Sequence, residues 1–285
     1  MRKLVSIFFT LACVCFRAVG ADSLSVMFWN VENFFDYRQE GVMEGKSWNA
    51  SRFYAKCNSV AKTIMMIADG YGGLPDVIGF AEIGDAFVMR QLLSSTILRK
   101  LDYRIVHFES PDHRGIDCAL LYRYGRLSLK SSRPVHIHNR DGTVMPTRDI
   151  LLAQFDSIAI LVNHHPSKVG AGSDDRRAIA METMEEACDS LEKAGCGRIL
   201  SMGDFNDALW PPEPCGTLKY NGKWEKIDGC FTRGPIRVSE TVCCDARLSV
   251  RDRKYGGMKP RRTYEGLKYQ GGTSDHYPIL LKVFF

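Results

Sequence analysis

The segment Ser201-Met202-Gly203-Asp204-Phe205-Asn206-Asp207 continues an apolar run that begins at Ile199 and is typical of a buried β-strand. Gly203 permits a tight exit from this strand, and an extended backbone would then place Asp204 and Asn206 on one side. A carboxylate can orient or deprotonate water, and an amide can donate a hydrogen bond to developing negative charge. The segment therefore predicts a buried strand that ends in two side chains, Asp204 and Asn206, suited to hydrolysis.

Short apolar runs with the length and β-branched content of strands recur along the chain. They lie at residues 25–29, 77–81, 103–108, 118–122, 150–155, 158–162, 199–202 and 279–284. Apolar residues at helical spacing predict helices beginning near Ser51, after the N-cap Asp85, and near Ser173 with a C-cap at Gly195. No linker, low-complexity tract or repeat divides residues 22–285, so we predict one α/β domain with layered sheets.

Asn30 and Glu82 follow the first two apolar runs. The Asn30 carbonyl could bind a hard cation, although a strand-ending asparagine that caps a turn is the simpler explanation. The ionised Glu82 carboxylate needs a cationic partner because unpaired burial of a charge is unfavourable. A metal ion is the natural partner, and an ion pair with Arg or Lys is the alternative.

Imidazole groups stand beside two other runs. His164 and His165 follow residues 158–162, where a histidine suits an acid or electrostatic group facing a phosphoryl oxygen, although a lone buried histidine is more often structural. Asp275 and His276 precede the last run and point to opposite sides of an extended chain. We expect Asp275 to reach a metal and His276 to face the substrate, with Asp228 as the carboxylate that holds the imidazole tautomer.

Taken in order, these segments resemble the endonuclease/exonuclease/phosphatase superfamily, which includes deoxyribonucleases, inositol polyphosphate 5-phosphatases and neutral sphingomyelinases. The resemblance extends from about residue 25 to residue 285. It implies a four-layer α/β sandwich in which two packed mixed β-sheets are flanked by helices. The segments that carry it are FWNVENFFD (28–36), DVIGFAEI (76–83), RGIDCALLYR (114–123), LVNHHPSK (161–168), MGDFND (202–207), KIDGCF (226–231) and GGTSDHYPIL (271–280).

The resemblance also implies a metal centre. Asn30 and Glu82 would hold Mg²⁺ or Mn²⁺, and Asp275 would assist at the same or a second position. An oxygen-rich site suits Mg²⁺, and the metal would offset and polarise the charge of a phosphate. Two positions depart from the family pattern: His165 stands where an apolar residue is common, and Gly229 follows Asp228 where relatives have an aromatic or apolar residue.

The remaining implied roles belong to five residues. Asp204 would orient and activate the attacking water, and Asn206 would hold a nonbridging oxygen. His276 would stabilise the pentacovalent phosphorane or assist proton transfer, with Asp228 orienting its ring. His164 occupies a position near the phosphate. These roles describe an enzyme that hydrolyses phosphate esters.

The N-terminus is typical of a signal peptide. Arg2 and Lys3 precede an apolar run at residues 4–16, which is too short to span a bilayer, and small residues occupy positions 18, 20 and 21. We therefore predict a signal peptide at residues 1–21, a catalytic domain at residues 22–285, and export to a periplasmic or extracellular location. Cys13 leaves lipid anchoring as an alternative.

Removal of the signal peptide leaves a nearly neutral protein. Residues 1–21 contain three of the 38 basic residues and none of the 33 acidic ones, so the formal charge falls from +5 to +2. This balance does not favour a protein that must grip a long polyanion. Basic residues nevertheless gather at residues 247–268, where they could bind extra phosphates or form a solvated surface. The substrate classes left open are nucleic acid, nucleotide, inositol phosphate and lipid headgroup; we expect a monomer without a stable protein partner.

Two other functions remain as alternatives. A catalytically weak or inactive binding module on the same fold would be signalled by loss of Glu82, Asp204 or His276, and none is lost. A serine hydrolase would use Ser274, but no nucleophile-elbow pattern surrounds this serine. The eight cysteines outside residues 1–21 permit disulfides without indicating their pairing, and Cys118 and Cys188 are expected as buried thiols.

Overall fold

Two β-sheets face one another in the computed structural model, which describes residues 23–170, 172–213 and 215–285. Among these residues the six-stranded sheet has the order β12 (Arg237–Val242), β17 (Ile279–Phe284), β1 (Ser23–Phe34), β2 (Val77–Ile83), β4 (Asp117–Arg123) and β3 (Tyr103–His107). The five-stranded sheet has the order β11 (Asp228–Arg233), β8 (Ile199–Asp204), β7 (Ala159–His164), β6 (Ile150–Phe155) and β5 (Leu129–Val135). The predicted signal peptide, with Cys13, lies outside the described residues.

Each sheet is mixed, because it contains a parallel pair flanked by antiparallel strands. β1 is parallel to β2 and β7 is parallel to β8. In each case a long helix makes the crossover between the two strands: α1 (Ala50–Gly70) joins β1 to β2, and α3 (Ser173–Lys193) joins β7 to β8. The described residues thus form two βαβ units, one in each sheet.

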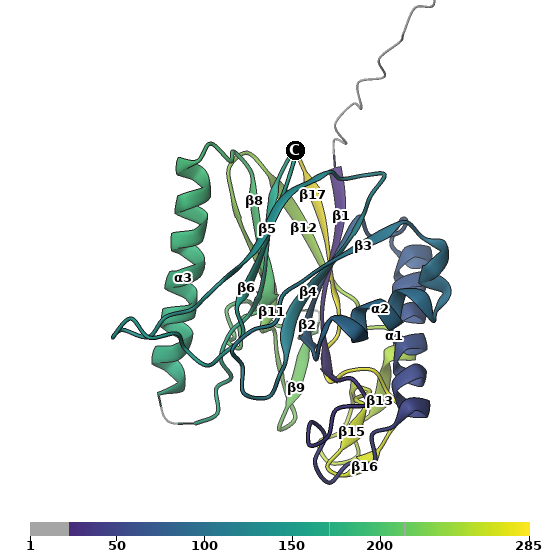
Figure 1. The fold of residues 1–285 in the computed structure, drawn as a ribbon. Coiled ribbons are helices and arrows are strands. Elements are labelled where there is room, and N and C mark those ends of the chain that lie inside the picture. Colours follow the sequence, from purple (N-terminus) through teal and green to yellow (C-terminus); the bar gives the residue numbers. More distant parts are fainter. Residues whose placement is uncertain (1–22, 171, 214) are drawn as a thin grey trace, which may run out of the picture.

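The helices cover the outer faces of the two sheets. α3 lies on one side of the sandwich, and α1 and α2 (Ala86–Ser94) lie on the other, followed by the short 3₁₀ helix η1 (Ile97–Lys100) (Figure 1). The predicted caps are present: Asp85 accepts a hydrogen bond from Val88 N at 3.0 Å, and Gly195 adopts a positive φ of 87°. No helix of the described residues has the length and apolar character needed to cross a membrane. The predicted four-layer α/β sandwich is confirmed.

Three apolar cores separate the four layers. The core between the sheets includes Phe28, Leu120, Ile160 and Met202, all fully buried. A second core lies between the six-stranded sheet and helices α1 and α2, and a third between the five-stranded sheet and α3. Both faces of each central strand are therefore buried, which explains the continuous apolar runs in the sequence.

Three strands of the sheets had no counterpart among the predicted runs. β5 and β12 are edge strands whose residues are mostly exposed or half-buried, so their sequences lack an apolar run. β11 begins at Asp228 and contains Gly229, whose missing side chain makes room for the Trp210 ring, 2.6 Å from an ideal Cβ position. The departure at Gly229 therefore has a packing role.

Short hairpins lie at one end of the sandwich, the lower end in Figure 1. They are formed by β9 (Leu218–Tyr220), β10 (Lys223–Glu225), β13 (Ser249–Arg251), β14 (Met258–Pro260), β15 (Tyr264–Glu265) and β16 (Lys268–Tyr269), with the 3₁₀ helix η2 (Ala246–Leu248) before β13. Figure 1 places β13, β15 and β16 beside one end of α1. We refer to residues 247–268 as the basic arm.

A disulfide joins Cys215, which precedes β9, to Cys244, which follows β12. The other six described cysteines are free thiols. Cys118 and Cys188 are buried among them, as predicted. The disulfide therefore ties the chain before the β9–β10 hairpin to the residues that lead into the basic arm.

Gly203 is needed for the close approach of β7 and β8. It pairs with Asn163, and a Cβ at position 203 would lie 2.5 Å from the Asn163 carbonyl oxygen. The glycine thus serves a contact between main chains inside the sheet, and the tight strand exit that we expected is not its role. The same contact sets the position of Asp204, the next residue.

We predict that Gly203→Ala lowers the free energy of unfolding by about 1–3 kcal/mol, the usual effect of overpacking a filled site. Gly197→Ala is the control, because a Cβ there meets no atom within 4 Å just before the same strand. Urea unfolding of both variants measures the difference. Equal midpoints for the two variants would show that β7 and β8 tolerate the extra methyl group.

Candidate active site

The carboxyl ends of the two parallel strand pairs meet at one cleft of about 320 Å³. Seven of the eight predicted site residues line it: Asn30, Glu82, His164, Asp204, Asn206, Asp275 and His276. The eighth, Asp228, is buried behind His276 and hydrogen-bonded to it. Residues from six separate parts of the chain are therefore brought together as the sequence predicted.

Strand register places the buried groups of the five-stranded sheet opposite one another. His164 pairs with Asp204 across β7 and β8, and Asp228 pairs with Asp204 across β11 and β8. His276 enters from the loop before β17 and forms an isolated bridge with Leu218. Asp204 thus lies at the centre of three neighbouring segments.

Asp204, Asp228 and His276 form a buried acid–imidazole–acid arrangement. His276 Nδ1 lies 2.8 Å from Asp228 Oδ2, and His276 Nε2 lies 3.9 Å from Asp204 Oδ2. Burial and the nearby charge of Asp228 raise the pKa of Asp204 to about 7. Burial alone would lower the pKa of His276, but the carboxylates of Asp228 and Asp204 outweigh it and raise the pKa well above its usual value. The two carboxylates therefore favour the protonated form of His276, which lies between them.

Asn30 and Glu82 lie next to Asp204 in the cleft. Asn30 Nδ2 donates to Asp204 Oδ2 at 3.0 Å and to Glu82 Oε1 at 3.3 Å, while Asn30 Oδ1 accepts from Glu32 N at 2.9 Å. Glu82 Oε2 accepts from Asn33 N at 2.6 Å. Glu82 has a φ of 64°, a strained value for a residue with a side chain. Within the described residues Glu82 forms no ion pair with Lys or Arg, so the alternative of such a pair is not found.

The chain leaves the extended conformation after Asp204. Asn206 has a φ of 51°, so the alternation that we expected for Asp204 and Asn206 does not apply. Asn206 N donates to Asp204 Oδ1 at 2.9 Å, and Asn206 Nδ2 donates to the His165 carbonyl at 2.9 Å. A tight turn, stabilised by the Asp204 side chain itself, therefore brings Asn206 to the cleft.

His164 and His165 have different environments. His164 lines the cleft, with Nε2 3.8 Å from Asp204 Oδ2, whereas the His165 ring packs edge-on against Phe205. Burial lowers the pKa of both, well below the usual value for His164 and to about 3 for His165. Burial therefore favours the neutral form of both rings. His165 supports the site through its carbonyl, which accepts from Asn206 and Arg148.

A second network next to the cleft was not predicted. Glu32 Oε1 accepts from Arg262 Nε at 2.9 Å, Glu32 Oε2 accepts from Thr263 N at 2.8 Å, and Arg262 lies 2.9 Å from Asp275 Oδ2. The fully buried Lys56 donates to Thr263 Oγ1 at 2.7 Å. The signals that could have indicated it were a glutamate inside the apolar segment at residues 28–35 and a lysine on the buried face of α1.

Burial shifts the ionisation of this network. Burial and the nearby Asp275 charge raise the pKa of Glu32 to about 7, and burial lowers the pKa of Lys56 to about 8. The network ties the basic arm to the end of β1. Arg262 and Asp275 face the cleft together, so the charge of Asp275 is partly offset by Arg262.

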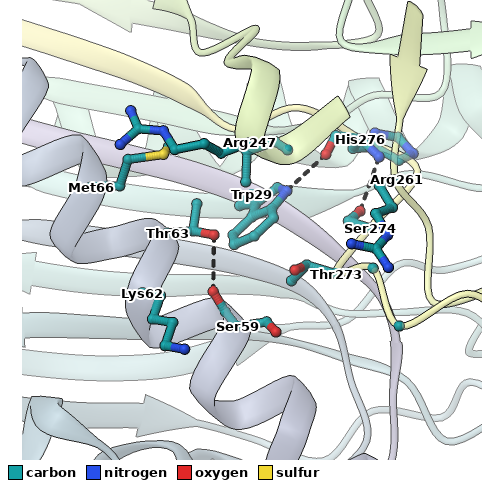
Figure 2. Close-up of a pocket in the computed structure, with 13 residues that line it drawn as sticks. Trp29, Ser59, Lys62, Thr63, Met66, Arg247, Arg261, Thr273, Ser274 and His276 are labelled. Carbon is teal, nitrogen blue, oxygen red and sulfur yellow. Dashed lines mark hydrogen bonds between the residues drawn. The ribbon is translucent and has the colours of Figure 1, made fainter. Parts of the chain in front are cut away.

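Ser274 does not have the surroundings of a nucleophile. Its hydroxyl donates to the Asn30 carbonyl at 2.6 Å and accepts from His276 N at 2.9 Å. Trp29 Nε1 donates to the His276 carbonyl at 2.9 Å, and Figure 2 shows both contacts to the His276 main chain. These hydrogen bonds engage Ser274 with main-chain groups and hold the backbone of His276, which removes the case for a serine hydrolase.

Known proteins share this fold. The sequence matches the Endonuclease/Exonuclease/phosphatase family over residues 25–227, and no curated protein matches it. The human Nocturnin catalytic domain superposes with a TM-score of 0.58 at 17% identity, covering 93% of this chain and 95% of that one. TDP2 from D. rerio, solved with a single-strand DNA product, has a TM-score of 0.55 at 15% identity, covering 92% and 99%.

A family protein from Bacteroides thetaiotaomicron has a TM-score of 0.56 at 14% identity, covering 92% of this chain and 98% of its own. At these identities the likeness concerns the fold. The family match covers most of the chain and includes in full five of the seven segments on which the resemblance was based. The chain belongs to the endonuclease/exonuclease/phosphatase family.

Proposed function

We propose that this protein is an exported, divalent-metal-dependent hydrolase in which water attacks the phosphorus of a phosphate ester. The observation that carries the proposal is the meeting of Glu82, Asp204 and His276 in one cleft, with Asp228 behind the histidine. Family membership supports the same reaction class. All of the residues whose loss would indicate an inactive binding module are present and line the same cleft, which supports the proposal of an enzyme.

The donor groups of the cleft fit a hard divalent cation. Glu82, Asp204 and Asp275 contribute carboxylates to the cleft, and the Asn30 amide oxygen, which accepts from Glu32 N, has a second lone pair to contribute. Glu82, with Asn30 and Asp275, would hold Mg²⁺ or Mn²⁺. The bound ion would neutralise charge on the phosphate and polarise it towards attack. Potential ligand atoms of Asp204, Asp228 and His276 also lie within 4.8 Å of one another. Because His276 and Asp228 are hydrogen-bonded to each other, we assign Asp228 to orienting the imidazole and not to binding the metal.

The chain's own residues divide the remaining tasks. Asp204, with a pKa of about 7, suits the acceptance of a proton from water near neutral pH. The cationic His276 would face a phosphoryl oxygen and donate a hydrogen bond to it, while Asp228 fixes the orientation of the ring. Asn206 Nδ2 uses one hydrogen for the His165 carbonyl, which leaves its second hydrogen for a nonbridging oxygen.

The basic arm indicates that the substrate carries negative charge beyond the scissile phosphate. Lys259 and Arg262 line both the active-site cleft and a neighbouring cleft of about 500 Å³. Arg251, Arg253 and Lys268 line the second cleft. Phosphate groups are natural partners for such a cluster. A nucleic-acid strand, a polyphosphorylated inositol, a nucleotide or a phospholipid headgroup at a charged surface all meet this requirement.

Export is supported by two features. The N-terminal segment has the order of a signal peptide, and the Cys215–Cys244 disulfide belongs to the chemistry of oxidising compartments. An exported enzyme would not act in genome repair. Its substrate would instead be a phosphate ester found outside the cytoplasm.

We expect EDTA to abolish hydrolysis of bis-p-nitrophenyl phosphate and added Mg²⁺ or Mn²⁺ to restore it. Glu82→Gln should lower the restored activity by orders of magnitude because the site loses the charge that pairs with the metal. Glu40→Gln, at an exposed position, is the matched control. A metal-supplemented panel of DNA, RNA, inositol phosphates, nucleotides and sphingomyelin then identifies the substrate. Undiminished activity after chelation would refute the metal mechanism.

We expect His276→Ala to reduce kcat by about 10²–10⁴. Asp228→Asn should lower the pKa of His276, because the Asp228 carboxylate opposes the effect of burial. The imidazolium would then lose its proton at a lower pH than in the parent protein. An NMR titration of labelled histidine in metal-free protein measures the shift.

His136→Ala is the matched control for this experiment, since His136 and Asp149 form a similar pair with Nδ1 and Oδ2 2.9 Å apart. It should leave kcat unchanged. Thermal unfolding checks that each variant is folded. An unchanged His276 titration in Asp228→Asn would show that Asp228 does not control the charge of the ring.

For localisation, we expect the mature protein to begin at Asp22 and to be recovered outside the cytoplasm. Mass spectrometry of fractionated cells measures its N-terminus. A lipid-modified N-terminus at Cys13, abolished by Cys13→Ser, would support the anchored alternative. Recovery of the intact chain from the cytoplasm would refute export.

A further inference from the structure

A second cluster of metal-binding side chains lies at the base of the loop at residues 108–116. His107 is the last residue of β3, Asp117 is the first residue of β4, and Glu109 follows His107 in the loop. One potential ligand atom from each residue lies within 4.8 Å of the other two. None of these residues lines the active-site cleft, so the cluster is separate from the centre described above.

His107 and Asp117 hold the facing atoms in the geometry of two metal ligands. Their side chains are 4% and 1% exposed, and His107 Nε2 lies 3.2 Å from Asp117 Oδ2. Two ligands bound at about 2.0–2.1 Å in tetrahedral or octahedral geometry are separated by roughly 3.0–3.4 Å. Within the described part of the chain neither atom makes a hydrogen bond. Both are buried polar atoms that an ion between them would satisfy.

Comparison with other His–Asp pairs of the chain separates this cluster from an ordinary hydrogen-bonded pair. His136 and Asp149 make a hydrogen bond at 2.9 Å, and His276 and Asp228 make one at 2.8 Å. In the His107–Asp117 pair, by contrast, the facing atoms Nε2 and Oδ2 both lack a hydrogen bond within the described residues. It also has a further carboxylate nearby: Glu109 Oε1 lies 3.9 Å from His107 Nδ1, the ring nitrogen next to the side that faces Asp117, so the Glu109 side chain would turn towards Nε2 to share an ion there.

The surrounding residues prepare Asp117 for this role. Asp117 Oδ1 accepts from Ser110 N at 2.8 Å, which directs Oδ2 towards His107. Glu109 is largely exposed, so its carboxylate is free to approach and water can complete the coordination. A set of one imidazole and two carboxylates favours Zn²⁺ over Mg²⁺ and Ca²⁺, which prefer ligand sets made of oxygen alone.

The loop above the cluster leads to the cleft. Arg114, at its tip, lines the cleft, and Asp112 pairs with the buried Arg148 at 3.2 Å. Arg148 in turn donates to the His165 carbonyl, which also holds Asn206. An ion bound by residues at both ends of the loop would close its base and restrict the position of Arg114.

We propose that His107, Glu109 and Asp117 form a second metal site, filled by Zn²⁺, which fastens the 108–116 loop that carries Arg114 to the cleft. The site does not depend on the hydrolytic mechanism. It is defined by binding and by the mobility of the loop, both of which are measurable in the absence of substrate.

The test is a calorimetric titration of the metal-free Glu82→Gln protein with Zn²⁺. Loss of a residue that only hydrogen-bonds to a metal ligand weakens metal binding roughly 10- to 100-fold, and Glu109→Gln, which removes a ligand, should weaken Zn²⁺ binding by more than that. His107→Ala should abolish binding of the Zn²⁺ ion at this site. Glu109→Gln should leave the metal-free melting temperature unchanged, because the side chain is 67% exposed. It therefore remains informative if the buried His107→Ala variant does not fold.

Hydrogen exchange of residues 108–116 supplies the second measurement. Zn²⁺ should slow exchange in the Glu82→Gln protein and have no effect when Glu109→Gln is added. His136→Ala and Glu40→Gln are the controls, and both should bind and respond like the background protein. Equal Zn²⁺ affinity with and without Glu109→Gln, or loop exchange that is unaffected by Zn²⁺, would overturn the proposal.

Discussion

The repulsion between Asp204 and Asp228 is the constraint on which the site depends. Antiparallel pairing of β8 with β11 places the two carboxylates opposite one another in the buried interior. Two like charges at this depth are unfavourable unless cationic or hydrogen-bonding groups offset them. His276, whose protonated form both carboxylates favour, lies between them, and Asn30 donates a hydrogen bond to Asp204. The raised pKa values of Asp204 and His276 both follow from this arrangement.

A second set of paired charges connects the cleft to the basic arm. It consists of Glu32, Arg262 and Asp275. The irregularity in β1 after Asn30 gives Glu32 a φ of 50° and directs its carboxylate to the arm. Arg262 then bridges Glu32 and Asp275. Because Asn30 and Glu32 are two residues apart on one strand, the same stretch of β1 contacts both Asp204 and the basic arm. A phosphate that attracts Arg262 would compete with both carboxylates.

The sequence predicted the parts of this structure in which burial leaves a local signal. Apolar runs identified the central strands because they are buried on both faces, and the exposed edges β5 and β12 left no comparable run. Asp204 and Glu82 could be recognised because they end such runs. The contact between Glu32 and Arg262 spans 230 residues and leaves no periodic trace. The turn at Asn206 also escaped prediction, because alternation along a strand cannot indicate where the backbone adopts a positive φ.

The two βαβ units explain why one cleft holds both halves of the chemistry. In each unit a helix returns the chain so that two strands run parallel, and their carboxyl ends then present side chains at the same edge. Asn30 and Glu82 come from the unit in the six-stranded sheet, and His164 and Asp204 come from the unit in the five-stranded sheet. In the proposed mechanism the first pair would hold the metal, and the second would surround the path of the attacking water. The apolar core between the sheets therefore sets how far apart the two pairs of side chains lie, so that packing far from the cleft controls the geometry of the site.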